Sequence, residues 1–245
     1  MANQLDHLIE FEEVLRSYQI SDESKRELAK DKLVLLTAPT SIGRNTIIKS
    51  LVNSGKYYFV LSDTTREPRI SDGAMEQSGE IYWFKTEVEI LEGLKQGKYL
   101  EAAIIHTQQV SGMRVDEIKK AAAQNKIAIK DVEIQGVESY MKAKPDTIAI
   151  FVLPPSFDEW MRRLKHRGPM SDQEFSRRLN SAIAEFDYGL KSDLFTFVIN
   201  DDFKRASQEI NELVKTNKVD IEDQEKCREL AASLRQIAID MKKTI

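Results

Sequence analysis

Residues 32–46 read Lys-Leu-Val-Leu-Leu-Thr-Ala-Pro-Thr-Ser-Ile-Gly-Arg-Asn-Thr, a short apolar run followed by a loop of small and polar residues. A continuous apolar run is typical of a parallel strand that is covered on both faces. The residues between Ile47 and Val52 place apolar side chains at helical spacing. A strand, a tight loop and a helix together favour anion binding, because N–H groups and the dipole at the helix start face the anion. We therefore expect a nucleotide-phosphate site at residues 38–46.

This loop departs from the usual phosphate-loop pattern, G-x-x-x-x-G-K-[ST]. The four key positions hold Ala38, Gly43, Arg44 and Asn45, and of these only Gly43 matches. Arginine keeps the positive charge of the usual lysine, but it is larger, planar and forked. Asn45 offers an amide oxygen where a hydroxyl ordinarily binds magnesium, which makes it the candidate metal ligand. The alternative to a phosphate site is an ordinary connection between a strand and a helix.

The rest of the chain alternates strand and helix patterns. Strands are predicted at 57–61, 81–84, 127–132, 147–152 and 196–199, and helices at about 87–96, 115–124, 135–142, 157–167 and 172–188. Such alternation indicates an α/β fold whose mostly parallel sheet carries helices on both faces. The segment 66–103 has strands and a helix of its own and predicts a small subdomain.

Helices are also predicted at both ends of the chain. Residues 3–30 predict two short helices, the second with Ser21 as its N-cap. Two more are predicted after Asp202, at roughly 203–217 and 221–243. We expect the last helix to pack on the core or on the N-terminal helices, with a dimer contact as the alternative.

Composition narrows the class of protein. The 245 residues are 41% apolar, which is enough for a sizeable core, and the net charge of −4 with interspersed signs argues against a surface that coats nucleic acid. The single cysteine, Cys227, allows no intrachain disulfide, and no apolar run reaches the length of a membrane span. We expect a cytoplasmic protein with no nucleic-acid or membrane partner.

The segment Ser62-Asp-Thr-Thr-Arg-Glu-Pro-Arg69 resembles the S-x-T-T-R-x-P-R stretch that follows the phosphate loop in guanylate kinases. The resemblance runs in the family's order over about residues 32–214, through the stretches at 79–84, 99–101, 131–136, 151–156, 163–168, 177–179 and 198–202. It implies a P-loop three-layer fold with a mostly parallel sheet, a small GMP-binding insert at about 66–103 and a helical lid at about 163–188. Residues 1–31 and 215–245 would then be helical extensions of the guanylate-kinase-like domain.

The resemblance assigns the insert to GMP. Arginine forks suit a phosphate because two N–H groups bond two oxygens at once. Glu101 matches the acid that reads guanine, since a carboxylate accepts from N1–H and the 2-amino group together. Asp131 and Glu133 match the paired acids that order guanine and the magnesium waters, although the second is an aspartate in the family. The implied GMP-binding set is Ser62, Arg66, Arg69, Tyr82, Glu101, Asp131 and Glu133.

The resemblance assigns the loop and the lid to ATP with Mg²⁺. Cations that close over the transferring phosphoryl group neutralise its charge and exclude water. The implied catalytic set is Arg44, Arg163, Arg167 and Arg178. Asn200 matches the residue near adenine, or else the Asn-Asp-Asp run is a turn and helix cap. The implied ATP-binding set is Ala38, Pro39, Thr40, Ser41, Ile42, Gly43, Arg44, Asn45, Thr46 and Asn200.

Two departures from the family leave two functions open. The family's Y-Y-G-[ST] segment aligns with Gln109-Val-Ser-Gly112, so both tyrosines are absent, and the stretch from Arg69 to Gly79 is longer than usual. One function is a guanylate kinase-like phosphotransferase, ATP + GMP to ADP + GDP, with dGMP as a second acceptor. The alternative is a degenerate domain that binds GMP or a protein partner without efficient catalysis. A kinase for another nucleoside monophosphate is a weaker option, because Glu101 favours guanine. We expect a monomer or a homodimer.

Overall fold

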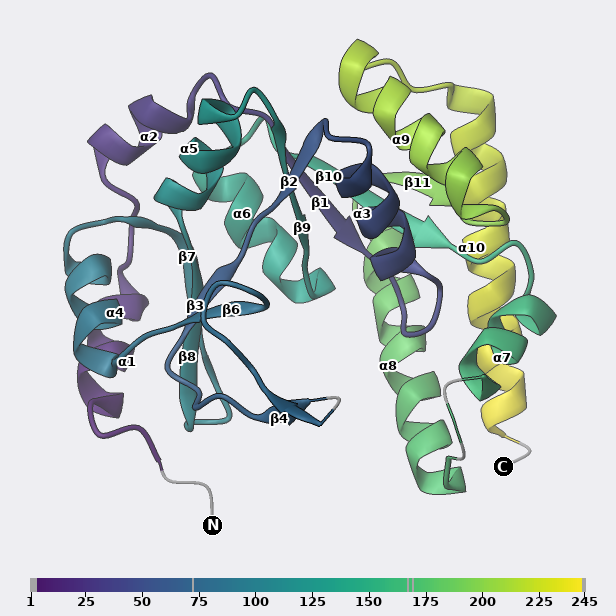
Figure 1. Cartoon of the computed structure of the whole chain (residues 1–245). Helices are drawn as coiled ribbons and strands as arrows, with labels where there is room; N and C mark the ends of the chain where they lie inside the picture. Colours follow the sequence, from purple (N-terminus) through teal and green to yellow (C-terminus); the bar gives the residue numbers. More distant parts are fainter. Residues whose placement is uncertain (1–3, 72, 167, 169, 244–245) are drawn as a thin grey trace. The chain divides into compact units, whose positions relative to one another are not determined.

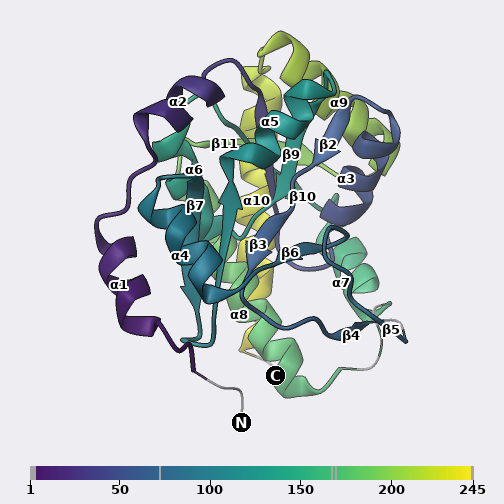
Figure 2. The same ribbon diagram turned by 60° about the vertical axis from the view of Figure 1, so that its left-hand side comes forward.

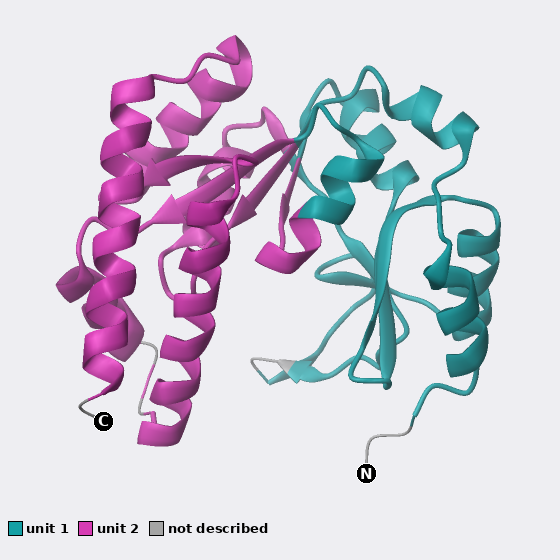
Figure 3. Cartoon of the chain, turned by 180° about the vertical axis from the view of Figure 1, so that it is seen from behind, with its two compact units in different colours: residues 1–33, 58–128, 138–147 teal, residues 34–57, 129–137, 148–245 magenta. Residues whose placement is uncertain are grey.

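The computed structural model describes residues 4–71, 73–166, 168 and 170–243 (Figure 1). The chain divides into two compact units, which Figure 3 colours separately. Unit 1 comprises residues 1–33, 58–128 and 138–147, and unit 2 comprises residues 34–57, 129–137 and 148–245. No helix in the described part of the chain has the length and apolar character needed to span a bilayer.

The phosphate-loop strand is the central strand of a five-stranded sheet. The order is β11 (Phe195–Ile199), β10 (Ile148–Leu153), β1 (Leu33–Thr37), β9 (Ile127–Asp131) and β2 (Tyr57–Phe59). β10 pairs in parallel with both β1 and β11. All five residues of β1 are buried, as expected for a strand with neighbours on each side and helices on both faces. The expected α/β class with a parallel sheet is confirmed.

Helices pack around this sheet in unit 2. They are α3 (Arg44–Asn53), α7 (Phe157–Lys165), α8 (Asp172–Lys191), α9 (Phe203–Thr216) and α10 (Ile221–Lys242), with a short 3₁₀ turn at Ile134–Gly136. In Figure 1, α10 runs along α8, and α10 also contacts β11. The last helix therefore packs on the core, which was one of its two expected positions. Asp202 caps α9 by accepting from two backbone N–H groups, so the cap expected in the Asn-Asp-Asp run is present.

Unit 1 has a second sheet of four strands. Its order is β6 (Tyr82–Phe84), β3 (Ser62–Thr64), β8 (Gln109–Arg114) and β7 (Tyr99–Ile105), and a small hairpin joins β4 (Ile70–Ser71) to β5 (Ala74–Met75). The β3–β6 pair is parallel, whereas β3–β8 and β7–β8 are antiparallel. Helices α4 (Glu87–Lys95), α5 (Val115–Ala123) and α6 (Val137–Ala143) complete the framework.

The two N-terminal helices belong to unit 1. Helix α1 (Leu8–Arg16) lies beside α4 and β7, as Figure 2 shows, and α2 (Asp22–Leu28) contacts α5. Apolar side chains from α1, α4 and the neighbouring strands form one cluster: Leu5, Phe11, Ile90, Leu91, Leu94, Tyr99 and Val110. Ser21 caps α2 as expected.

The structure corrects the expected strands in one region. The strand predicted at 57–61 is present but ends at Phe59, where it joins the five-stranded sheet as β2; residues 62–64 form a separate strand, β3, in the other sheet, which was not predicted. The β7–β8 hairpin was not predicted at all. Its turn places His106 and Thr107 in the left-handed region, with φ of 51° and 57°, a conformation that glycine or asparagine ordinarily signals.

Candidate functional site

The loop between β1 and α3 has a conformation that its glycine makes possible. Gly43 precedes α3 with φ of 99°, and Ser41 also lies in the left-handed region with φ of 66°. A Cβ atom on Gly43 would collide with the side-chain amide of Asn200. The one position that matches the phosphate-loop pattern is therefore the one where a side chain does not fit.

Side chains from other elements hold this loop in place. The Ile42 carbonyl accepts hydrogen bonds from Asn200 Nδ2 at 2.7 Å and from Arg163 Nη1 at 2.9 Å. Arg163 also donates to the Asn200 carbonyl at 3.0 Å and to Glu159 at 2.7 Å. Trp160 Nε1 donates to the Thr40 carbonyl at 2.9 Å. In this structure Arg163 and the buried Asn200 thus bind the loop itself, and they determine where its N–H groups point.

The loop lines a cavity of about 440 Å³ in unit 2. Three buried polar atoms on its lining residues, Ser41 Oγ, Arg178 Nη1 and Glu185 Oε2, have no hydrogen-bond partner among the described residues. Buried polar atoms in folded proteins are ordinarily paired, because leaving one unpaired costs about 1–3 kcal/mol. Bound water or a ligand would have to supply the missing partners at these positions. Every expected loop residue from Ala38 to Thr46 lines the cavity, as do Glu133, Arg163 and Arg178.

Arg44 is turned toward the end of β9. Its Nη1 donates to the Val132 carbonyl at 3.0 Å, and its Nη2 lies 3.5 Å from Asp131 Oδ2. The side chain that replaces the usual lysine is thus paired with one of the two expected acids. Both partners are partly exposed, so this ion pair is a weak one that a phosphate can displace.

Helix α8 brings a further acid that the sequence reasoning missed. Arg178, Ser181 and Glu185 follow one another at spacings of three and four residues, which places them on one face of the helix, and all three line the cavity. Burial, and next the charge of Glu133, raise the pKa of Glu185 to about 7 against the opposing charge of Arg44. The helical spacing from Arg178 was the signal that could have identified Glu185.

Of the expected lid arginines, Arg178 also pairs within its helix. Its Nε donates to Glu174 at 2.7 Å, and Arg177 forms two bonds to the same carboxylate. These hydrogen bonds lower the pKa of Glu174 to about 2. Arg178 is thus anchored through Nε while its Nη1 has no partner among the described residues. Arg167 lies outside the described residues.

The oxygen atoms around the cavity suit a hard divalent cation. The described residues contain no group of three or more His, Cys, Asp or Glu side chains that could hold a metal by themselves. The cavity lining does contain Asn45, Glu133 and Glu185. Magnesium in nucleotide sites is typically held by one or two protein oxygens together with substrate phosphates and water. The donor set therefore fits Mg²⁺ bound with a nucleotide better than a dedicated metal site.

The expected phosphate-binding residues of unit 1 gather around Arg66. Its guanidinium lies 5.3 Å from the centre of the Tyr82 ring and 5.4 Å from that of Phe84. Ser62 pairs with Tyr82 in the register of β3 and β6. The exposed Arg69 joins this group through its backbone N–H, which donates to Glu76.

The guanidinium of Arg66 is paired with the carboxylate of Glu76, a residue that the sequence reasoning missed. Arg66 donates to the two oxygens of Glu76 at 2.7 and 3.1 Å, and the Arg69 N–H donates to Glu76 at 2.9 Å. The hydrogen bond from Arg66, and next that from Arg69, hold the pKa of Glu76 below its usual value. Glu76 follows the β4–β5 hairpin and lies in the stretch from Arg69 to Gly79, which is longer than usual in the family. This extra length was the feature of the sequence that could have pointed to Glu76.

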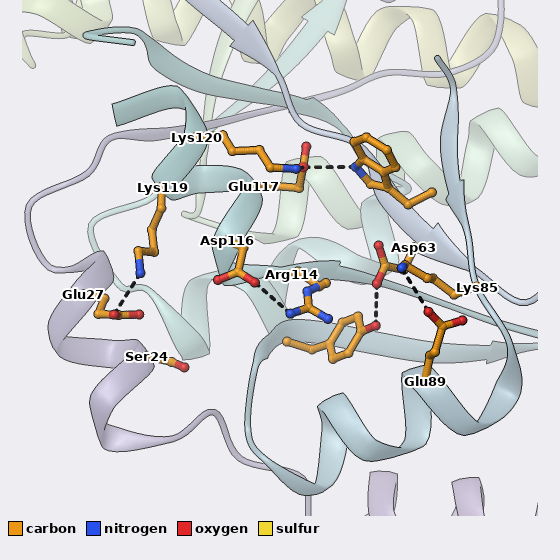
Figure 4. A network of polar contacts seen from close by, with 12 residues as sticks. Ser24, Glu27, Asp63, Lys85, Glu89, Arg114, Asp116, Glu117, Lys119 and Lys120 are labelled. Carbon is orange, nitrogen blue, oxygen red and sulfur yellow. Dashed lines mark hydrogen bonds and ion pairs between the residues drawn. The ribbon is translucent and has the colours of Figure 1, made fainter. Parts of the chain in front are cut away.

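Glu101 lies on β7, apart from the arginine group. It accepts a hydrogen bond from the Tyr140 hydroxyl at 2.6 Å. Two residues earlier, the Tyr99 hydroxyl donates to the buried Asp63 at 2.6 Å, and Arg114 lies over the Tyr99 ring (Figure 4). Of the seven expected GMP residues, Asp131 and Glu133 belong to unit 2 and the others to unit 1.

Comparison with known proteins identifies the family. The family model described as guanylate kinase matches residues 30–217. This chain belongs to the guanylate kinase family. It is 31% identical over 188 residues to a guanylate kinase of Trichormus variabilis, covering 76% of this chain and 91% of that protein. It is 30% identical over 192 residues to one from Corynebacterium jeikeium, covering 78% and 99%.

Two other guanylate kinases extend the comparison. The chain is 32% identical over 186 residues to guanylate kinase 1 of Oryza sativa, covering 75% of this chain and 47% of that longer protein. The crystal structure of guanylate kinase from Anaplasma phagocytophilum superposes with a TM-score of 0.53 at 19% identity, covering 79% of this chain and 89% of that chain. This likeness supports the fold. Helices α1, α2 and α10 lie outside the part that the guanylate kinase model matches.

Proposed function

We propose that this chain is a guanylate kinase-like phosphotransferase that converts ATP and GMP to ADP and GDP with magnesium. The observation that carries the proposal is the cavity of unit 2, where Ser41, Arg178 and Glu185 present buried polar atoms without partners among the described residues. A domain kept only as a scaffold gains nothing from leaving a guanidinium N–H unpaired beside a phosphate loop, because that arrangement costs stability.

Catalysis would consist of positioning and charge neutralisation. The N–H groups at the start of α3 would bind the donor phosphates, as helix N-termini do. Arg163 and Asn200 would keep the loop in shape, and Arg178 would donate its unpaired Nη1 to the transferring group. Magnesium neutralises phosphate charge when it is bound, and Asn45 and Glu133 are the side chains that would hold it.

The acceptor would be bound by residues of unit 1. Ser62, Arg66, Arg69 and Tyr82 would hold the phosphate of GMP, and Glu101 would accept from guanine N1–H and the 2-amino group. Asp131, the last residue of β9, and Glu133, two residues later, match the paired acids of the family and stay a prediction for the acceptor set. AMP offers no donor pair to Glu101, so we expect it to be a poor acceptor.

A second candidate function has its own observation. Arg44 and Arg66, two cations proposed to meet phosphates, are paired with Asp131 and Glu76 in this structure. A nucleotide would have to displace or share these carboxylates. If it does so poorly, the chain would bind GMP or a protein partner without efficient transfer.

A coupled assay of ATP-dependent GDP formation separates the two candidates. We expect turnover with GMP and dGMP, little with AMP or UMP, and none after Mg²⁺ is chelated. Arg178→Ala should lower kcat at least about a hundredfold, which is the scale of losing one preorganised donor to the transition state. Arg205→Ala, which removes an exposed arginine of α9 in the same unit, is the matched control and should keep full activity.

Calorimetry with GMP distinguishes the remaining outcomes if turnover is absent. The chain would be a GMP-binding domain and not an enzyme if two results are found together: wild-type activity is no higher than that of Arg178→Ala, and GMP binds to the wild type but not to Arg66→Ala. The absence of GMP binding in the wild type would contradict the kinase and would leave only the protein-binding form of the second candidate.

A further inference from the structure

The N-terminal segment holds the strand that carries Glu101 through a single side chain. The Tyr18 hydroxyl donates to the Tyr99 carbonyl at 2.6 Å and accepts from the Tyr99 N–H at 2.9 Å. One hydroxyl thus satisfies both backbone groups of a residue at the edge of the sheet, as a neighbouring strand would. Tyr18 lies outside the segment matched by the family model, so the comparisons give it no role.

The strand is irregular at the point that Tyr18 holds. Tyr99 pairs with Arg114 of β8, whereas Glu101 pairs with Met113, so three residues of β7 face two of β8. Such a bulge re-aims the side chains that follow it and leaves a residue unpaired in the ladder. The direction of the Glu101 side chain therefore depends on how the bulge is held, and Tyr18 binds its first residue.

More contacts fix the same stretch from the N-terminal side. The Gly97 carbonyl accepts from the Ser21 N–H at 3.1 Å and from the Ser24 hydroxyl at 3.0 Å. Gly97 has φ of 63°, and a Cβ atom there would lie 2.6 Å from the Ser21 nitrogen. The close approach of α2 to residues 97–99 thus requires this glycine.

Tyr99 connects the N-terminal segment to both expected GMP-binding strands. Its side chain bonds Asp63, which is the neighbour of Ser62 on β3, and its backbone stands two residues before Glu101. Tyr18 and Glu101 also line one cavity of about 400 Å³ in unit 1. Burial raises the pKa of Tyr18 to about 12, so its hydroxyl keeps the proton that it donates at physiological pH.

We propose that Tyr18 is a positioning residue for guanine recognition: by holding Tyr99, it sets the direction in which Glu101 meets the base. The proposal rests on the proposed function for the role of Glu101. It gives the N-terminal helices a purpose beyond covering apolar surface, namely selectivity for the 2-amino group of the acceptor.

The test compares GMP with inosine monophosphate, which lacks the 2-amino group, in the full chain. Both affinities are measured by calorimetry, and both kcat/KM values by the coupled assay. Tyr18→Phe, which removes both hydrogen bonds to the Tyr99 backbone, should reduce the preference for GMP about three- to tenfold, a change on the scale of one net hydrogen bond, while the KM for ATP stays unchanged. Glu101→Gln should remove more of the preference, and adding Tyr18→Phe to it should change nothing further.

The matched control is Tyr57→Phe, which removes another tyrosine hydroxyl, hydrogen bonded to Asn211 in unit 2, and should leave the preference intact. Hydrogen exchange of the Tyr99 amide measures the contact with the Tyr18 hydroxyl directly, and the exchange should accelerate only in Tyr18→Phe. Faster exchange with an unchanged preference would overturn the inference and leave the proposed function standing. A wild type that does not prefer GMP would overturn the proposed function, and with it the role of Tyr18 in guanine selectivity.

Discussion

Replacing Glu185 by glutamine should make the protein more stable at high pH and leave it nearly unchanged at low pH. The carboxyl lies in the phosphate-loop cavity, where burial, and then Glu133, raise its pKa to about 7 from an ordinary 4.5. Between these values the folded chain keeps the proton of Glu185, whereas the unfolded chain releases it. Stability therefore falls as pH rises through this window.

The size of the effect follows from the two pKa values. Each pH unit between them is worth about 1.4 kcal/mol, so the complete loss is about 3 kcal/mol, reached above pH 7. Glutamine carries no ionisable proton and avoids this loss. The free energy of unfolding of Glu185→Gln should thus exceed that of the wild type by about 3 kcal/mol at about pH 8.5, with a difference near zero at about pH 4.5.

Urea unfolding at several pH values, followed by circular dichroism, measures this difference. Glu212→Gln, on the exposed face of α9, controls for the removal of one negative charge. Titration of the Glu185 carboxyl carbon by NMR gives the pKa directly, and Arg44→Ala should raise it further because Arg44 opposes the shift. Parallel stability profiles for wild type and Glu185→Gln, or a carboxyl that titrates near its ordinary 4.5, would refute the reasoning.

Two further substitutions test the phosphate sites separately. Gly43→Ala should weaken ATP binding more than about tenfold and leave GMP binding unchanged, because a left-handed backbone costs a residue with a side chain about 1–2 kcal/mol and the new Cβ displaces Asn200. Titration with a fluorescent ATP analogue measures the affinity for ATP, and equal affinities of wild type and variant would show that the loop can adjust. Glu76→Gln should tighten GMP binding severalfold in calorimetry, since the carboxylate and the phosphate compete for the Arg66 fork. Weaker binding would show instead that Glu76 holds Arg66 in place for the phosphate, and Glu80→Gln is the control.

The loop and its strand were predictable because their signals are local. A continuous apolar run before a glycine-containing loop needs no distant information to indicate β1 and the start of α3. The family motifs located the acceptor arginines in the same way, since they are short stretches in a set order. Residues 38–46 line one cavity together with Glu133, Arg163 and Arg178, whereas Asn200 binds the loop without lining it, and the chemical roles of all these residues stay a prediction.

The missed features depend on partners that lie far away in the sequence. The β7–β8 hairpin lacks a glycine or asparagine at its turn although His106 and Thr107 lie in the left-handed region, and the Thr107 carbonyl accepts a hydrogen bond from the distant Leu5 N–H. The lid role predicted for Arg163 gave no sign of its hydrogen bonds to the carbonyls of residues 42 and 200, which are distant in the sequence. Tyr18 gives no local signal at all, because its contact with Tyr99 spans 81 positions.

The two proposed phosphate sites share one electrostatic feature. Arg44 forms an ion pair with Asp131, and Arg66 forms one with Glu76, so each cation has a carboxylate of the same chain as its partner. The Arg66 pair is nearly buried and bidentate, whereas the Arg44 pair is longer and more exposed. A carboxylate that pairs with a cation in the absence of ligand lowers the free-energy cost of keeping that cation in the site. The same carboxylate competes with a phosphate, which must bind the cation more strongly than the carboxylate does. By this argument the acceptor phosphate faces the stronger competitor, so GMP affinity should depend on Glu76 more than ATP affinity depends on Asp131.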